Sequence, residues 1–142
     1  MTLQYGLTAA PAAQPFNAIV GQVVSLAIAQ GIGQIDDDNL EPWLKMPIAT
    51  SLAIAVMVKL GVTHPPAGAA ALLFASGRNS WAMVGIMILA NFIAIATATI
   101  INNASQRRQY PTFWGLGFVA KYLFPPAKVE ADETPKKATK TV

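Results

Sequence analysis

The sequence predicts an all-α integral membrane protein with about three transmembrane helices. Of its 142 residues, 54% are hydrophobic and only 12% are charged, about half the charge of an ordinary soluble domain. The mean hydropathy is +0.43. Two long stretches, 1–35 and 79–106, contain no charged residue. Such stretches suit lipid better than water, because about 20 apolar residues in a helix span the hydrocarbon core.

The first span is expected over residues 17–34. Residues 1–16 contain two prolines among alanine and threonine, so we expect an extended lead-in that ends where a helix begins. Gln22, Ser25 and Gln30 interrupt the apolar sequence of the span. Because such polar groups need hydrogen-bond partners inside a bundle, this helix should face protein on at least one side.

The second span is expected over residues 43–62, after an acidic segment at 36–41 that cannot enter hydrocarbon. Trp43 would lie at the membrane interface. Only 13 residues separate Lys45 from Lys59. Both lysine side chains must therefore extend toward the two membrane surfaces.

Residues 65–77 are apolar but too few to cross a membrane. The run from Ala67 to Gly77 has 11 residues, which at about 1.5 Å per residue reach about half of a 30 Å core. We predict a re-entrant half-helix that enters and leaves on the same side. Pro65 and Pro66 would begin this half-helix, and Gly77 would end it.

The third span, residues 81–102, gives the strongest signal, with 22 residues and no charge. Ala90, Ala94 and Ala98 recur at a spacing of four. Small residues at this spacing allow close approach of a neighbouring helix, although ordinary packing is the commoner reason for them. Asn91 lies within this stripe.

The chain after the third span divides into two parts. Arg107 and Arg108 end the predicted membrane domain, 17–104. Residues 105–127 are aromatic and interrupted by glycine and proline, so we expect them to lie in the membrane interface or against a partner. Residues 128–142 have the composition of a disordered tail.

Three crossings would place the N-terminus on one side of the membrane and the acidic loop and the C-terminus on the other. The lysines and arginines near the spans then divide two against four: Lys59 and Arg78 against Lys45, Arg107, Arg108 and Lys121. The positive-inside rule therefore predicts a C-terminus on the cytoplasmic or stromal side.

The composition also argues against an enzyme. The chain has one histidine and no cysteine, and its acids lie in one loop and the tail. The sequence therefore contains no nucleophile–base pair, paired carboxylates, phosphate loop or metal-ligand spacing, and we predict no catalytic or metal site. The basic residues collect beside the spans, which indicates a membrane anchor and no nucleic-acid partner.

The most specific string in the chain is a six-residue motif. It consists of Thr63, His64, Pro65, Pro66, Ala67 and Gly68. It resembles the motif for which the HPP family of membrane proteins is named. A second match is Gln14-Pro15-Phe16-Asn17 with Gly21-Gln22, where the family typically shows Gln-Pro-Arg-Asn followed by Gly-His. The resemblance covers residues 12–103. Family members usually have four hydrophobic segments, and this chain is expected to lack the earliest.

The resemblance implies a transport function, because HPP relatives of chloroplasts and cyanobacteria are associated with nitrite transport. Phe16 and Gln22, however, replace the family's Arg and His, and an anion path needs cationic or donor groups to replace hydration. The leading hypothesis is therefore a non-catalytic subunit of a larger membrane complex, in a thylakoid or related photosynthetic membrane. Its partners would be lipid and other membrane subunits, with chlorophyll or carotenoid as possible cofactors. The alternative is a small nitrite permease or permease subunit.

His64 admits two interpretations. It can be structural, with Thr63 as a cap and the imidazole bonded to a neighbouring carbonyl. It can instead be a ligand, either for a solute at the half-helix N-terminus or for a chlorophyll magnesium. Gln22 and Asn91 are weaker candidates of the same kind, since each more often bonds across helices.

Overall fold

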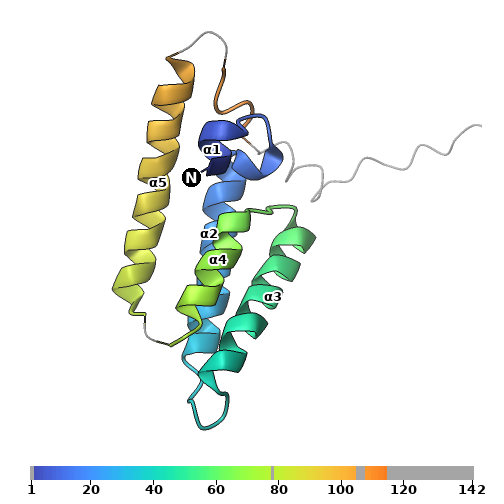
Figure 1. Cartoon of the computed structure of the whole chain (residues 1–142), viewed down its shortest axis with the longest axis vertical. Coiled ribbons are helices and arrows are strands. Elements are labelled where there is room, and N and C mark those ends of the chain that lie inside the picture. Colours follow the sequence, from blue (N-terminus) through green and yellow to red (C-terminus); the bar gives the residue numbers. More distant parts are fainter. Residues whose placement is uncertain (1, 78, 105–107, 115–142) are drawn as a thin grey trace, which may run out of the picture.

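The computed structural model describes residues 2–77, 79–104 and 108–114, and in these ranges the chain is helical with no strand. Its elements are α1 (Thr2–Gly6), a 3-10 turn η1 (Pro11–Ala13), α2 (Pro15–Gly33), α3 (Pro42–Leu60), α4 (Pro65–Phe74) and α5 (Trp81–Asn103). Figure 1 shows the long helices side by side in one bundle. The predicted all-α class is confirmed.

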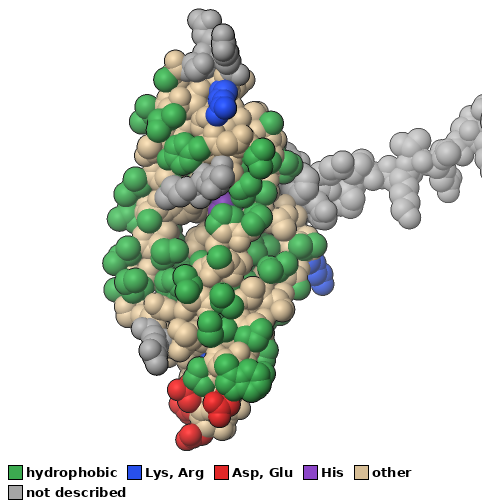
Figure 2. All heavy atoms as spheres, in the orientation of Figure 1, with side chains coloured by type: hydrophobic (Ala, Val, Ile, Leu, Met, Phe, Trp, Pro, Cys, Tyr) green, Lys and Arg blue, Asp and Glu red, His purple; other side chains and the backbone are tan. Residues whose placement is uncertain are grey.

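Three of the helices, α2, α3 and α5, are long and apolar enough to cross a membrane, which confirms the expected number of spans. Trp43 is the second residue of α3 and Trp81 is the first residue of α5, and each is 66% exposed. Trp114, at the opposite end of the bundle, is 67% exposed. Tryptophan prefers the membrane interface, so these side chains mark the two surfaces. Figure 2 shows the acidic side chains gathered at one end and hydrophobic side chains along the length of the molecule.

The predicted short helix is present as α4, but its path differs from that of a re-entrant helix. At its start, His64 is hydrogen-bonded to Ala12, just before α2. At its end, the carbonyl of Phe74 lies beside Gly33, the last residue of α2. The helix therefore runs in the same direction as α2 and returns the chain to the acidic end.

The two described ends of the chain consequently meet at one end of the bundle (Figure 1). Asn102 donates a hydrogen bond to the Gln4 carbonyl at 3.0 Å, and the Tyr110 hydroxyl donates one to the Ala13 carbonyl at 2.7 Å. The expectation that the two ends of the chain lie on opposite sides differs from this arrangement of the described residues 2–14 and 108–114. It counted three crossings and did not include the passage made by α4.

The first residues form a compact cap where we expected an extended lead-in. We call residues 2–14, with α1 and η1, the N-terminal cap. Its centre is Gln14, a fully buried side chain. The Nε2 group of Gln14 donates to the carbonyls of Thr8 and Ala10 at 2.7 and 3.1 Å. Its Oε1 accepts from the backbone N–H of Thr112 at 3.1 Å. One amide thus folds the lead-in and joins it to the chain after α5.

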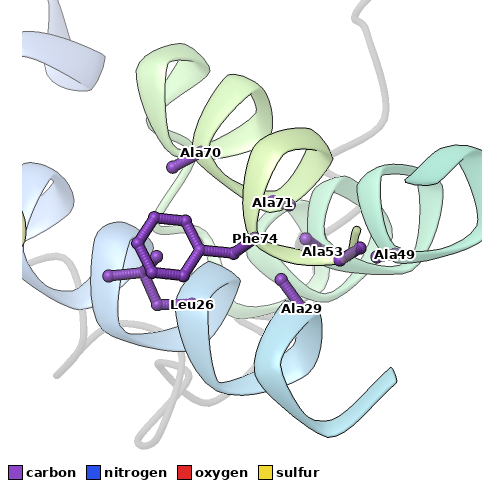
Figure 3. Close-up of a cluster of buried hydrophobic side chains, with 8 residues drawn as sticks. Leu26, Ala29, Ala49, Ala53, Ala70, Ala71 and Phe74 are labelled. Atoms are coloured by element: carbon purple, nitrogen blue, oxygen red, sulfur yellow. The ribbon is translucent and has the colours of Figure 1, made fainter. Parts of the chain in front are cut away.

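The main core lies between α2, α3 and α4 and consists largely of alanine. Its members are Leu26, Ala29, Ala49, Ala53, Ala70, Ala71, Phe74 and Ala75. Figure 3 shows the Phe74 ring pointing from α4 onto Leu26 of α2. Small side chains let helix backbones approach closely, which is how helices associate where lipid removes the hydrophobic driving force between them.

Helix α5 packs chiefly along α2, and little of its surface is buried. Ala94 and Ala98 are buried, whereas Ala90 is exposed. Ala98 packs against Ala18 and Tyr110 of the same chain. The last two residues of the predicted alanine stripe, Ala94 and Ala98, are therefore buried by contacts within the chain. The predicted interfacial segment 105–127 is described only at 108–114, and the predicted tail lies outside the described residues.

This topology predicts the sides from which single cysteines are labelled. The chain has no cysteine of its own. With a membrane-impermeant maleimide, Ala9→Cys and Gln109→Cys should react from one side, because both residues are exposed at the cap end. Asn39→Cys, in the acidic loop, should react from the other side. Labelling of Ala9→Cys and Gln109→Cys from opposite sides would show that α4 does not return the chain.

Candidate functional site

The Thr63–Gly68 motif begins in a tight turn after α3. Gly61 ends α3 in the left-handed conformation, with φ of 69°, which glycine adopts without steric cost. The N–H of Val62 then bonds the Met57 carbonyl at 2.9 Å. Val62 and His64 are each 3% exposed. The turn therefore lies against the bundle.

Gly21 of α2 is the surface on which this turn rests. A Cβ atom at this position would lie 2.8 Å from the Val62 carbonyl oxygen and 2.9 Å from the Cβ of His64. Real Cβ atoms do not approach other atoms this closely, so only glycine fits here. The motif therefore packs backbone against backbone on α2.

The His64 ring joins the motif to the N-terminal cap. Its Nδ1 lies 2.9 Å from the Ala12 carbonyl oxygen. A carbonyl only accepts, so Nδ1 carries the proton, and in the neutral ring Nε2 carries the lone pair. This is the contact that the structural interpretation of His64 requires. His64, and not Thr63, is the N-cap residue of α4, and it makes no side-chain cap bond.

The N-terminus of α4 offers few free donors to an anion. Pro65 and Pro66 occupy its first two positions and have no N–H. The N–H of Ala67 bonds the His64 carbonyl at 2.9 Å. Anion sites at helix N-termini depend on these first N–H groups. The solute-site interpretation of His64 therefore has little support in the geometry.

Ser25 holds the other end of the motif, a role that the sequence did not reveal. Its hydroxyl donates to the Ala67 carbonyl across the α2–α4 interface. Ser25 follows Gly21 by four residues, which places both on one face of α2. This spacing is the feature of the sequence that could have indicated a common contact surface for Gly21 and Ser25. In the sequence alone, Ser25 is recognisable only as a polar interruption of the first span.

Asn91 lies at a different interface from His64. Asn91 Nδ2 donates to the Ala18 carbonyl at 2.9 Å and so joins α5 to α2. Gln22 is 5% exposed, and its Nε2 has no partner among the described protein atoms. The structure thus does not bring the three candidate ligand residues together in one site.

A groove of about 360 Å³ lies between α3 and α4 beside the motif. Ile54, Met57, Gly68 and Leu72 contribute to its largely apolar lining, and His64 lies at one end. An apolar chain or ring fits such a lining better than a hydrated ion. No group of three or more His, Cys, Asp or Glu residues that could hold a metal occurs in the described ranges.

The opposite end of the bundle is polar and acidic. A depression of about 750 Å³ is lined by residues 36–38, Lys45, Ser76 and Gly77, among others. Lys45 is 1% exposed. Its Nζ lies 2.6 Å from an Asp37 carboxylate oxygen and also donates to the Ile35 carbonyl. Because Asp37 neutralises this lysine, the remaining carboxylates give this end a negative potential.

Comparisons with known proteins agree with this architecture. A family model described as "HPP, transmembrane region" matches residues 1–111. Within that range the shorter apolar helix α4 accompanies the three long helices. No solved structure matches the chain.

Two relatives come from Dictyostelium discoideum, and each is named only as a transmembrane protein. One is 31% identical over 118 residues, which cover 79% of this chain and 38% of the relative. The other is 31% identical over 116 residues, which cover 78% of this chain and 41% of the relative. The chain thus spans about two fifths of the length of these relatives.

The contact at Gly21 predicts that alanine substitutions at two glycines of α2 have different effects on stability. Gly21→Ala should lower the free energy of unfolding by about 1–3 kcal/mol, because the added Cβ meets backbone atoms that cannot move freely. Gly31→Ala is the matched control, since nothing lies within 4 Å of its Cβ position. Thermal unfolding in detergent measures both variants. Equal midpoints would mean that the turn does not rest on Gly21.

The burial of Tyr110, which bonds the N-terminal cap at Ala13, predicts that the stability of the cap depends on pH. Burial, followed by the nearby Tyr5, raises the pKa of Tyr110 from 10.0 to about 12. The unfolded chain ionises first, so Tyr110's contribution to stability is complete below pH 10 and is lost between pH 10 and about 12. Absorbance of tyrosinate should show a late component that Tyr110→Phe removes. Titration of all tyrosines below pH 11 would contradict the buried position.

Proposed function

Since this chain belongs to the HPP transmembrane-region family, we propose that it is a non-catalytic membrane subunit packed beside other membrane proteins in a larger complex. The family match covers residues 1–111. A subunit of a complex must contact its neighbours through the outward faces of its helices. The main support comes from the outward face of α3.

The outward face of α3 has the residues that a neighbouring helix needs. Pro47, Ser51 and Ala55 follow one another at a spacing of four and are all exposed. Together with Ile48 and Leu52 they surround a shallow, open hollow of about 500 Å³. Small side chains and a hydroxyl are typical of helix–helix contacts in membranes, because they allow close backbone approach and hydrogen bonding. Lipid alone favours larger apolar side chains on such a face.

The exposed face of α5 does not distinguish a partner from lipid. Its outward residues are large and apolar, and include Leu89 and Ile93, each 59% exposed, and Ile100, 72% exposed. Lipid tails cover such side chains as well as protein does. The hollow on α3 is therefore the more informative surface.

The alternative function, a small nitrite permease, has weaker geometric support. Two prolines remove donors from the start of α4. The acidic end presents Asp36, Asp37, Asp38 and Glu41, all exposed, to any approaching anion. Like charge at a pore mouth lowers the local concentration of an anion. A pathway for nitrite would have to overcome both features.

The kind of complex is proposed from the family resemblance. HPP relatives occur in chloroplasts and cyanobacteria, so we assign this subunit to a thylakoid or related photosynthetic membrane, beside pigment-bearing subunits. The apolar groove between α3 and α4 has a lining that suits a chlorophyll or carotenoid tail. The pigment content of the gently purified complex tests this assignment.

The charges at the two ends support an orientation. Lys59 and Arg108 are exposed at the cap end, whereas Lys45 at the acidic end is buried and paired with Asp37. Basic residues favour the cytoplasmic side. The C-terminal segment, and with it the N-terminal cap, is therefore proposed to face the cytoplasm or stroma.

The proposal predicts that bulk on the α3 face releases the partners. Ser51→Leu and Ala55→Leu should each reduce the amount of partner protein that co-purifies from the source membrane, because leucine fills the hollow on which a helix would pack. Their thermal midpoints should stay near that of the wild type, since both residues point away from the core. Quantitative mass spectrometry of the purified material measures the loss.

Ala96→Leu is the matched control, because Ala96 is exposed on α5 and the added volume equals that of Ala55→Leu. It should retain the partners. Equal recovery of partners with Ala55→Leu and with the wild type would refute the docking face. Nitrite uptake by vesicles that contain only this protein would refute the proposal as a whole.

A further inference from the structure

Two buried amide donors among the described residues have no protein partner: Gln4 Nε2 in the N-terminal cap and Gln22 Nε2 in α2. Only Gln22 lies within a membrane-spanning helix. Gln22 is 5% exposed, and its Nε2 meets no acceptor among the described atoms. Burying an amide donor without a hydrogen bond costs about 1–3 kcal/mol, and in hydrocarbon no solvent relieves that cost. An unpaired donor of this kind inside a membrane bundle indicates that a bound molecule accepts its hydrogen bond.

Asn91 is bonded to α2 one turn before Gln22. Its Nδ2 bonds the Ala18 carbonyl at 2.9 Å. In an α-helix that carbonyl also accepts the backbone N–H of the residue four positions later, which is Gln22. Side chains on a helix lean toward its N-terminus, so the Gln22 side chain extends back toward Ala18. The two amides therefore lie within about one helical turn of each other at the α2–α5 interface.

The orientation of Asn91 determines what can lie between the two amides. A carbonyl cannot donate, so the group that meets Ala18 must be the NH₂ of Asn91, and its Oδ1 can accept a hydrogen bond from another group. Gln22 contributes a donor and Asn91 an acceptor. They do not bond each other directly. A molecule that bridges them must both accept and donate a hydrogen bond.

We propose that the Gln22–Asn91 pair binds a water molecule inside the membrane domain, at the junction of α2 and α5. Water accepts from Gln22 Nε2 and donates to Asn91 Oδ1, and buried waters commonly join polar groups in this way. A simple anion such as nitrite has no proton to donate, so Asn91 Oδ1 would oppose it. The site therefore selects a small neutral hydroxylic molecule. It is independent of the docking face on α3.

The bridge has a mechanical role as well. Helix α5 is held to the bundle mainly through α2, with little of its surface buried. Asn91 already bonds the Ala18 carbonyl, and the water adds a second connection one turn further along α2. Removing either amide should loosen α5 without touching the core around Phe74.

Nuclear magnetic resonance of the full chain in lipid nanodiscs tests the proposal. With ¹⁵N-glutamine labelling, the Nε2 protons of Gln22 should show magnetisation transfer from water, and this signal should fall to background in Asn91→Leu. Gln14 is the internal control, because it is fully buried and its NH₂ is bonded to Thr8 and Ala10. It should show no such transfer. The resonance that disappears in Gln22→Met is assigned to the Gln22 side chain.

Two results would overturn the proposal. One is a Gln22 amide that is as isolated from water as that of Gln14. The other is a saturable shift of the Gln22 resonance on addition of sodium nitrite, which would make the guest an anion. Thermal unfolding gives a separate test: Gln22→Met should lower the midpoint if water satisfies the amide, whereas a rise in the midpoint would mean that the amide has no partner. Gln34→Met, at an exposed position, should change nothing.

Discussion

The contact between the Val62–His64 turn and Gly21 determines the arrangement of the other elements. At this point the turn meets α2 with almost no side-chain volume between the two backbones. The short distance brings the His64 ring to the Ala12 carbonyl and lets the Ser25 hydroxyl reach the carbonyl of Ala67. Helix α4 is thereby fixed along α2 at both ends of the motif. A larger residue at position 21 would displace all three contacts together.

Hydrogen bonds from side chains to distant backbone carbonyls complement this close packing. Asn91, Asn102 and Gln30 each donate from an amide to a carbonyl of another segment. In lipid the hydrophobic effect no longer draws helices together, so such bonds and the fit of small residues take its place. The core is accordingly rich in alanine, and Phe74 is its one aromatic member. Polar residues that interrupted the apolar pattern therefore hold the bundle together.

Much of the fold could be predicted from the sequence, because hydropathy and charge report directly on membrane spans. The spans agree with α2, α3 and α5 to within about two residues, a normal uncertainty for helix ends. The direction of α4 could not be predicted in this way. Its ten residues are too few for a hydropathy window, and its path depends on the contact between Gly21 and Val62, which lie far apart in sequence. The N-terminal cap was missed because Gln14 bonds Thr112, 98 positions away. At the site, the position of His64 beside a carbonyl was foreseen as one possibility, whereas Ser25 was not, because its partner is the backbone of another helix.

The meeting of the two chain ends has a consequence for biosynthesis. Carbonyl groups of the N-terminal cap accept hydrogen bonds from Asn102, Arg108 and Tyr110. These residues lie at the end of α5 and beyond it, so they are synthesised after α2, α3 and α4. Helix α2 can insert early, since its own backbone bonds are internal. The cap, in contrast, cannot be completed until α5 has crossed and the chain beyond it has emerged. The residues of the cap are therefore synthesised before α2 but reach their final contacts only after α5. Until then the polar groups of Gln4 and Gln14 need water or the insertion machinery as hydrogen-bond partners, and closure of the cap follows the crossing of α5.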